Sequence, residues 1–180
     1  MKFALRSAAV AVALASCALL AGAQSSNPVS DAVRSSMKRS ANIMVAAAKA
    51  MPAGKYSYKP TPGSMSFGQL VLHIGRSNAM TCHWLAGGAP MAGAKLTPTS
   101  PKDALVAYLQ KAFDYCNSKL ADLNDSSLSS MKTFYGGHQV TEAALLFGLT
   151  DDMADHYSQE AAYLRKNGLL PPSAHGRGRP

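Results

Sequence analysis

Residues 145–172 constrain the fold more than any other stretch of this chain. Side chains spaced by three and four positions share one face of a helix. That face carries Leu145, Leu149, Asp152, His156, Gln159 and Tyr163. A basic last turn, then Asn167-Gly168 and two prolines, marks the end of the helix. The stretch therefore predicts a helix whose apolar stripe packs against the core of the protein.

The same stripe contains a carboxylate and an imidazole one helical turn apart. Burying Asp152 and His156 among leucines is costly unless each side chain finds a strong partner. Either the two side chains hold each other, or both bind a metal ion. The spacing of four residues leaves both alternatives open.

Two segments carry a recognisable pattern. The first is Ser66-Phe67-Gly68-Gln69-Leu70-Val71-Leu72-His73-Ile74, and the second comprises His156-Tyr157-Ser158-Gln159, Tyr163-Leu164-Arg165 and Asn167-Gly168-Leu169-Leu170-Pro171-Pro172-Ser173. Together they resemble the motifs of the DinB-like (YfiT-like) metalloproteins, which are small helical bundles. The resemblance spans most of the chain after its first 23 residues.

The resemblance implies a metal site. In this family one histidine from the second helix and two from the fourth, four residues apart, bind a divalent metal. His73 and His156 match that pattern, whereas Asp152 stands where the family has a histidine. Two imidazoles and one carboxylate form a facial triad that suits zinc, nickel or iron. We therefore expect one divalent metal held by His73, Asp152 and His156.

Two alternatives for function follow from the resemblance. The first is a metal-dependent transferase or hydrolase acting on a small-molecule substrate, with a thiol as the co-reactant that some relatives use. The second is a non-catalytic bundle with a degenerate metal site that binds a small ligand or a protein partner. The chain has no nucleophile elbow and no phosphate-binding glycine loop, so catalysis would have to be metal-centred. Many relatives form dimers, which makes a homodimer a further expectation.

Residues 1–23 have the pattern of an export signal. Lys2 and Arg6 precede an uncharged apolar run over residues 7–20, and small residues at 21–23 suit cleavage after Ala23. A rival cut before Cys17 would make a lipoprotein. The run is shorter than the roughly 20 residues that a spanning helix needs. We therefore expect a periplasmic or secreted protein without a stable membrane span after cleavage.

The positive charge does not indicate a nucleic-acid-binding protein. The chain has 18 basic and 10 acidic residues and a net charge of +8. Its basic residues are scattered, and export would separate the protein from nucleic acid. Residues 24–173 are long enough for one domain with its own core. Residues 174–180, with Arg177 and Arg179, are expected to form a disordered basic tail.

Helical periodicity predicts an all-α protein. The expected helices cover residues 30–51, 66–86 and 100–123, and a fourth begins at 141–142. Residues 87–99 form a loop long enough to cross the bundle between the second and third helices. Residues 124–140, rich in serine and glycine, form the second long connection and show no alternating strand of useful length. The fold prediction is a four-helix bundle, in the up-down-down-up order of the family.

Cys82 and Cys116 would be the only cysteines left after cleavage. An even pair in an exported protein favours a disulfide. The bond requires the second and third helices to run parallel, because antiparallel helices would separate the two residues by about 13 Å along the axis. Two buried free thiols, or a reactive cysteine near the metal, are the alternatives.

Two further histidines have weaker claims as ligands. His83 follows His73 by ten residues and so lies about 80° round the helix from it. His138 precedes the fourth helix and is a reserve ligand. Trp84, Tyr157 and Tyr163 are expected to serve in packing.

Overall fold

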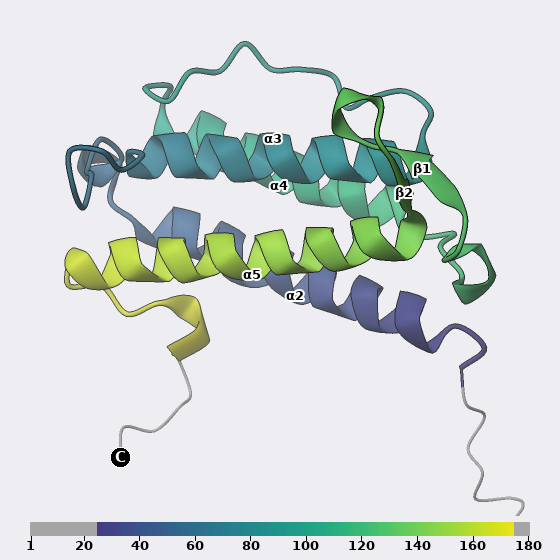
Figure 1. Cartoon of the computed structure of the whole chain (residues 1–180). Coiled ribbons are helices and arrows are strands. Elements are labelled where there is room, and N and C mark those ends of the chain that lie inside the picture. Colours follow the sequence, from purple (N-terminus) through teal and green to yellow (C-terminus); the bar gives the residue numbers. More distant parts are fainter. Residues whose placement is uncertain (1–24, 175–180) are drawn as a thin grey trace, which may run out of the picture.

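The computed structural model describes residues 25–174. The predicted signal at residues 1–23, with Cys17, and nearly all of the expected tail lie outside the described residues. Four long helices lie side by side (Figure 1). They are α2 (Pro28–Ala50), α3 (Phe67–Ala86), α4 (Lys102–Lys119) and α5 (Glu142–Lys166). The prediction of an all-α four-helix bundle is confirmed.

The helix ends follow the local signals in the sequence. At the start of α3, Ser66 and Gln69 form a capping box, in which each side chain accepts from the backbone N–H of the other. Thr141 caps α5 by accepting from the N–H of Ala144 at 3.2 Å. Gly168, with φ of +73°, ends α5, and Leu169 N donates to Leu164 O. This is a Schellman motif, which the Asn-Gly pair indicates.

The connection between α4 and α5 differs from the prediction. It contains strands β1 (Met131–Thr133) and β2 (Gln139–Thr141), paired antiparallel with Lys132 opposite Val140. The sequence predicted no alternating strand of useful length there, and strands of three residues are too short to show alternation. Gly136 and Gly137, both with positive φ, lie in the turn that joins them. The short 3₁₀ turns are η1 (Ala53–Lys55), η2 (Asp125–Ser127), η3 (Tyr135–Gly137) and η4 (Pro172–Ala174).

Helices α3 and α4 run in the same direction. The residues that contact each other rise in number along both helices: Gly68 lies next to Leu105, Gly75 next to Leu109, and Cys82 is bonded to Cys116. The loop after α3 therefore returns along the bundle before α4 begins (Figure 1). Helices α2 and α5 also start at one end of the bundle, because Val29 and Ala143 line the same cavity.

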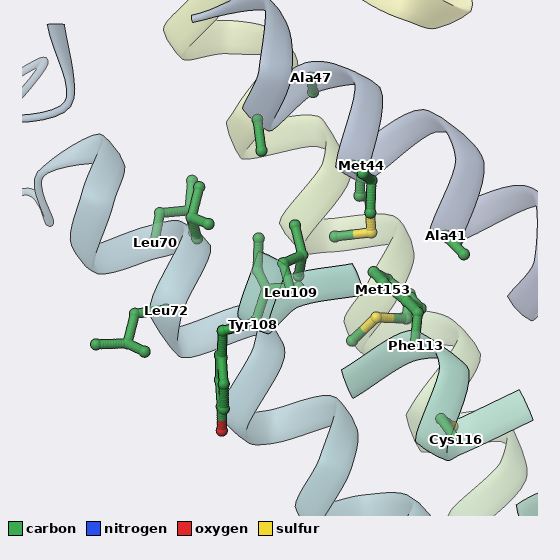
Figure 2. Packing of buried hydrophobic residues seen from close by; sticks show 14 of the residues in the cluster. Ala41, Met44, Ala47, Leu70, Leu72, Tyr108, Leu109, Phe113, Cys116 and Met153 are labelled. Carbon is green, nitrogen blue, oxygen red and sulfur yellow. The ribbon is translucent and has the colours of Figure 1, made fainter. Parts of the chain in front are cut away.

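The core lies between the four helices. Met44, Leu70, Leu109, Phe113 and Met153 are fully buried in it (Figure 2). Glycines let α3 approach its neighbours closely: a Cβ at Gly68 would lie 2.5 Å from Pro98 O, and one at Gly75 would lie 2.9 Å from the Tyr108 ring. The close packing of α3 therefore depends on these two glycines.

The predicted disulfide joins α3 to α4. Cys82 and Cys116 are bonded in the structure, with a Cα–Cα distance of 5.2 Å, which lies within the usual range. Among residues 25–174, no helix is both long enough and apolar enough to span a membrane.

Candidate ligand-binding site

Helices α3 and α5 bring the three predicted ligands together. His73 lies on α3, whereas Asp152 and His156 lie one turn apart on α5. The rings of the two histidines stack with their centroids 5.0 Å apart and their planes at 15°. His156 Nδ1 is 3.4 Å from Oδ1 of Asp152. The sequence therefore identified residues that meet at one place between the two helices.

His156 is fixed by its own helix. Its Nδ1 donates to the backbone oxygen of Asp152 at 2.8 Å, so Nδ1 carries a proton. His156 is buried, whereas His73 is exposed at the edge of the pair. Partial burial, and then the neighbouring His156, lowers the pKa of His73 below the ordinary value of 6.5. His73 is therefore favoured in its neutral form.

Asp152 has a hydroxyl partner on the facing helix. Its Oδ2 accepts from Ser77 Oγ at 2.9 Å. The side chain is 36% exposed, and within residues 25–174 no lysine or arginine forms a salt bridge with it. The carboxylate is therefore oriented by a neutral partner and stays open to solvent.

The two imidazoles and the carboxylate are chemically suitable ligands for a divalent metal, but they are not oriented to bind one ion. The lone pair of an imidazole nitrogen lies in the plane of the ring, so two nearly parallel stacked rings cannot direct their lone pairs at one ion. Within the described residues, no three His, Cys, Asp or Glu side chains are grouped so that they could hold a metal. A metal would require one ring to turn, and metal binding at His73, Asp152 and His156 stays a prediction.

A cavity of about 380 Å³ lies beside Asp152. We call it the hairpin pocket, because the segment that carries β1 and β2 closes one side of it. Its walls include Ser77 and Trp84 from α3, Phe134 and Val140 from the hairpin, and Gly148 and Asp152 from α5. Cavities of about 510 and 580 Å³ elsewhere are lined by none of the predicted site residues.

The hairpin pocket has an apolar body and one anionic end. Asp152 is the only charged side chain among the residues that line it, and Ser77 and Thr81 contribute hydroxyl groups. At the other end, the rings of Trp84 and Phe134 meet edge to face, 4.7 Å between centroids. The pocket can therefore receive an apolar molecule and orient it through one polar contact.

The sequence matches the model of the DinB superfamily over residues 36–159, which is more than half of the chain. The chain belongs to the DinB superfamily. The family that the two motifs suggested is thus confirmed. No curated protein matches the sequence of this DinB protein.

Solved structures show the same fold. A DinB-like protein from Bacillus subtilis is 22% identical, with a TM-score of 0.64 over 77% of this chain and 93% of that one. A DinB-like protein from Bacillus cereus is 14% identical, with a TM-score of 0.66 over 79% and 95%. A conserved protein from Enterococcus faecalis is 19% identical, with a TM-score of 0.61 over 77% and 95%.

The sequence interpretation missed one buried acid in this DinB bundle. Glu160 lies fully buried on α5, and within residues 25–174 both of its carboxyl oxygens lack a hydrogen-bond partner. Burial raises its pKa well above the ordinary value. The signal was its spacing: Glu160 follows the buried Leu146 and Met153 in steps of seven, which places it on the core face.

The other histidines lie away from the stacked pair. His138 is exposed in the hairpin, where its ring lies next to Gly136. His83 is half-buried, and its Nδ1 has no hydrogen-bond partner in the described part of the chain. Neither histidine lines the hairpin pocket.

Proposed function

We propose that this DinB protein binds a small, largely apolar molecule in the hairpin pocket. The observation that carries the proposal is a cavity of about 380 Å³ whose lining contains one carboxylate among apolar side chains. Small-molecule sites typically have about 300–1,000 Å³ and a few placed polar groups. Of the two alternatives that the sequence left open, this supports the bundle that binds a small ligand.

The elements around the pocket have separate roles. Helices α3 and α5 form rigid walls, and the hairpin covers the end at which Trp84 meets Phe134. Apolar surface that a ligand buries there contributes roughly 25 cal/mol per Å² to binding, before the entropic cost of association. The hydrogen bond from Ser77 holds the carboxylate of Asp152, so the polar contact has a defined direction.

Trp84 provides the measurement, because it is the only tryptophan in the chain and lines the pocket. We expect 2-phenylethanol to cause a saturable change in its fluorescence. Gly148 also lines the pocket, and a Cβ built there meets nothing within 4 Å. The backbone there has room for a Cβ, so we expect a leucine to occupy part of the cavity and Gly148→Leu to weaken binding at least tenfold.

Ala154→Leu is the matched control, because Ala154 is exposed on the same helix and does not line the pocket. It should bind the probe as the wild type does. The melting temperatures of both variants show whether the bundle stays folded. The proposal is wrong if the wild type gives no saturable change, or if Gly148→Leu binds as tightly as the wild type.

Export is part of the same proposal. The apolar N-terminal run motivates it, and the disulfide between Cys82 and Cys116 supports it. Structural disulfides persist in oxidising compartments and are rare in the cytosol. The protein would therefore act in the periplasm or outside the cell.

A divalent metal is the second candidate for a bound group. His73, Asp152 and His156 meet at one place, and Nδ1 of His156 is hydrogen-bonded to a backbone carbonyl. Histidines that bind metals commonly make such a bond with their other ring nitrogen. The stacked rings count against this candidate, so no reaction is derived from it.

A further inference from the structure

We propose that the hairpin pocket selects monocationic amines, with the ammonium group at Asp152 and an apolar body that extends toward Trp84. This rests on the proposed function, because it names the class of ligand for the same pocket. The argument uses the charge of the lining, the hydrogen bonds of the carboxylate and the distance between the two ends.

The pocket carries an uncompensated negative charge. Asp152 is the only charged residue in its lining, and its salt bridges within the described residues involve no lysine or arginine. Two more carboxylates, Asp151 and Asp155, are exposed on the same helix. A carboxylate in a partly apolar cavity favours a cation, and an anion there would meet repulsion without a donor of opposite charge.

The carboxylate of Asp152 has free capacity to accept hydrogen bonds. Its two oxygens offer about four acceptor positions. Ser77 uses one of them. The imidazole of His156 is nearer to the backbone oxygen of Asp152, at 2.8 Å, than to its carboxylate, at 3.4 Å. The ring is therefore committed mainly to the backbone, and the carboxylate keeps acceptor positions for a ligand.

The lining of the pocket provides an opposite charge at one end only. Ser77 and Trp84 are seven residues apart on α3, which is about 10 Å along the helix axis. The far end is formed by the rings of Trp84 and Phe134, together with Val140. A second ammonium group at that end would meet aromatic rings but no carboxylate, so only one ammonium group of a ligand can pair with an opposite charge in the pocket. An arylalkylamine places its ring there instead.

Three probes of similar size and different charge test the inference. They are 2-phenylethylamine, 2-phenylethanol and phenylacetate, each titrated at pH 7.5 against the fluorescence of Trp84. The ammonium group adds a Coulombic attraction to the carboxylate of Asp152, which the neutral hydroxyl group of the alcohol lacks. We therefore expect the amine to bind about tenfold more tightly than the alcohol, and phenylacetate to bind most weakly.

Asp152→Asn removes the charge and keeps the shape of the side chain. It should bring the affinities of the amine and the alcohol to within about twofold of each other. Asp155→Asn makes the same change in charge on an exposed residue outside the pocket, so it should keep the wild-type preference. If Asp152→Asn does not fold, Asp152→Ser replaces it, and the ratio measured on the wild type still decides the inference.

Each result bears on one of the two proposals. If the wild type binds the amine and the alcohol equally, and Gly148→Leu blocks both, the preference for amines is wrong. The proposal that the hairpin pocket binds a small molecule is then still supported. If no probe causes a saturable change, both proposals are wrong. If Asp152→Asn folds and still prefers the amine tenfold, the assignment of the cation to Asp152 is overturned.

Discussion

The imidazoles of His73 and His156 stack across the interface of α3 and α5, with 5.0 Å between their centroids. Two protonated rings at this distance would repel each other. Partial burial, and then the neighbouring His156, lowers the pKa of His73, which agrees with a neutral ring in the stack. The stacked pair therefore links the stability of this interface to the protonation of His73.

The first prediction concerns acid. Because the pKa of His73 is lowered in the folded state, the unfolded chain binds more protons just below pH 6.5. The contribution of His73 to stability is thus full above pH 6.5 and falls as the pH drops toward the folded pKa. Thermal unfolding at pH 7.5, 6.5 and 5.5 should show a smaller loss of stability for His73→Gln than for the wild type. His138→Gln, at an exposed histidine, should behave as the wild type. Equal slopes for His73→Gln and the wild type would contradict this.

The second prediction concerns metal. Asp152→His adds a third imidazole beside His73 and His156 and restores the commoner family pattern. Because imidazole is a good zinc ligand, the variant should bind zinc at least as tightly as the wild type, as measured by competition with a chelating dye. Asp155→His places the same residue at an exposed position on α5 and should give no gain. If Asp152→His binds zinc more weakly than the wild type while the fold stays intact, the three residues are not a metal site.

The third prediction concerns the disulfide. Cys82 and Cys116 are 34 residues apart, and closing such a loop stabilises a fold by about 4 kcal/mol in the chain-entropy model. The double variant Cys82→Ala, Cys116→Ala should therefore unfold at a clearly lower denaturant concentration. Thiol titration of unfolded, unreduced wild-type protein should find no free thiol at these positions. Two free thiols per mature chain would disprove the bond in solution.

The fourth prediction compares two buried glutamates on α5. Glu142 accepts from Ser130 and forms a salt bridge with Lys132 at 3.2 Å, whereas Glu160 has no hydrogen-bond partner among the residues that the structure describes. An unsatisfied buried polar group costs on the order of 1–3 kcal/mol. We therefore expect Glu160→Met to stabilise the protein and Glu142→Met to destabilise it, as measured by denaturant unfolding.

The pH dependence gives Glu160 a second test. Burial raises its pKa in the folded state, so above about pH 4.5 the unfolded chain binds fewer protons and stability falls as the pH rises toward the folded pKa. The gain from Glu160→Met should therefore be larger at pH 8 than at pH 5. A gain that is equal at both values would mean that Glu160 is not buried in its protonated form.

The fifth prediction concerns processing. The small residues at positions 21–23 follow an apolar run, so the exported protein should begin at Gln24. Mass spectrometry of protein recovered from the export compartment measures this directly. A diacylated Cys17 would instead make the protein a lipoprotein, and an intact N-terminus would contradict cleavage.

The sequence indicated the helices well because their signals are local. The capping box at Ser66 and the glycine cap at Gly168 involve residues within one or two turns of each other. The hairpin was missed because each of its strands has three residues. Glu160 was missed because a glutamate is ordinarily expected on the solvent-facing side of a helix, whatever its spacing. The family motif placed His73 near His156, but the orientation of the rings depends on how α3 packs against α5, which no local pattern encodes.

The bond between Cys82 and Cys116 joins α3 to α4 near the C-terminal ends of both helices. Helix α5 and the hairpin contain no cysteine, so no disulfide holds them to this bonded pair. Native proteins open locally in cooperative units, and we expect such opening at the boundary between the bonded pair and α5 with the hairpin. The hairpin pocket spans this boundary, with Ser77 on one side and Asp152 on the other. A ligand in the hairpin pocket would contact both α3 and α5 and so hold them together. Its binding should therefore slow amide hydrogen exchange in α5 more than in α4.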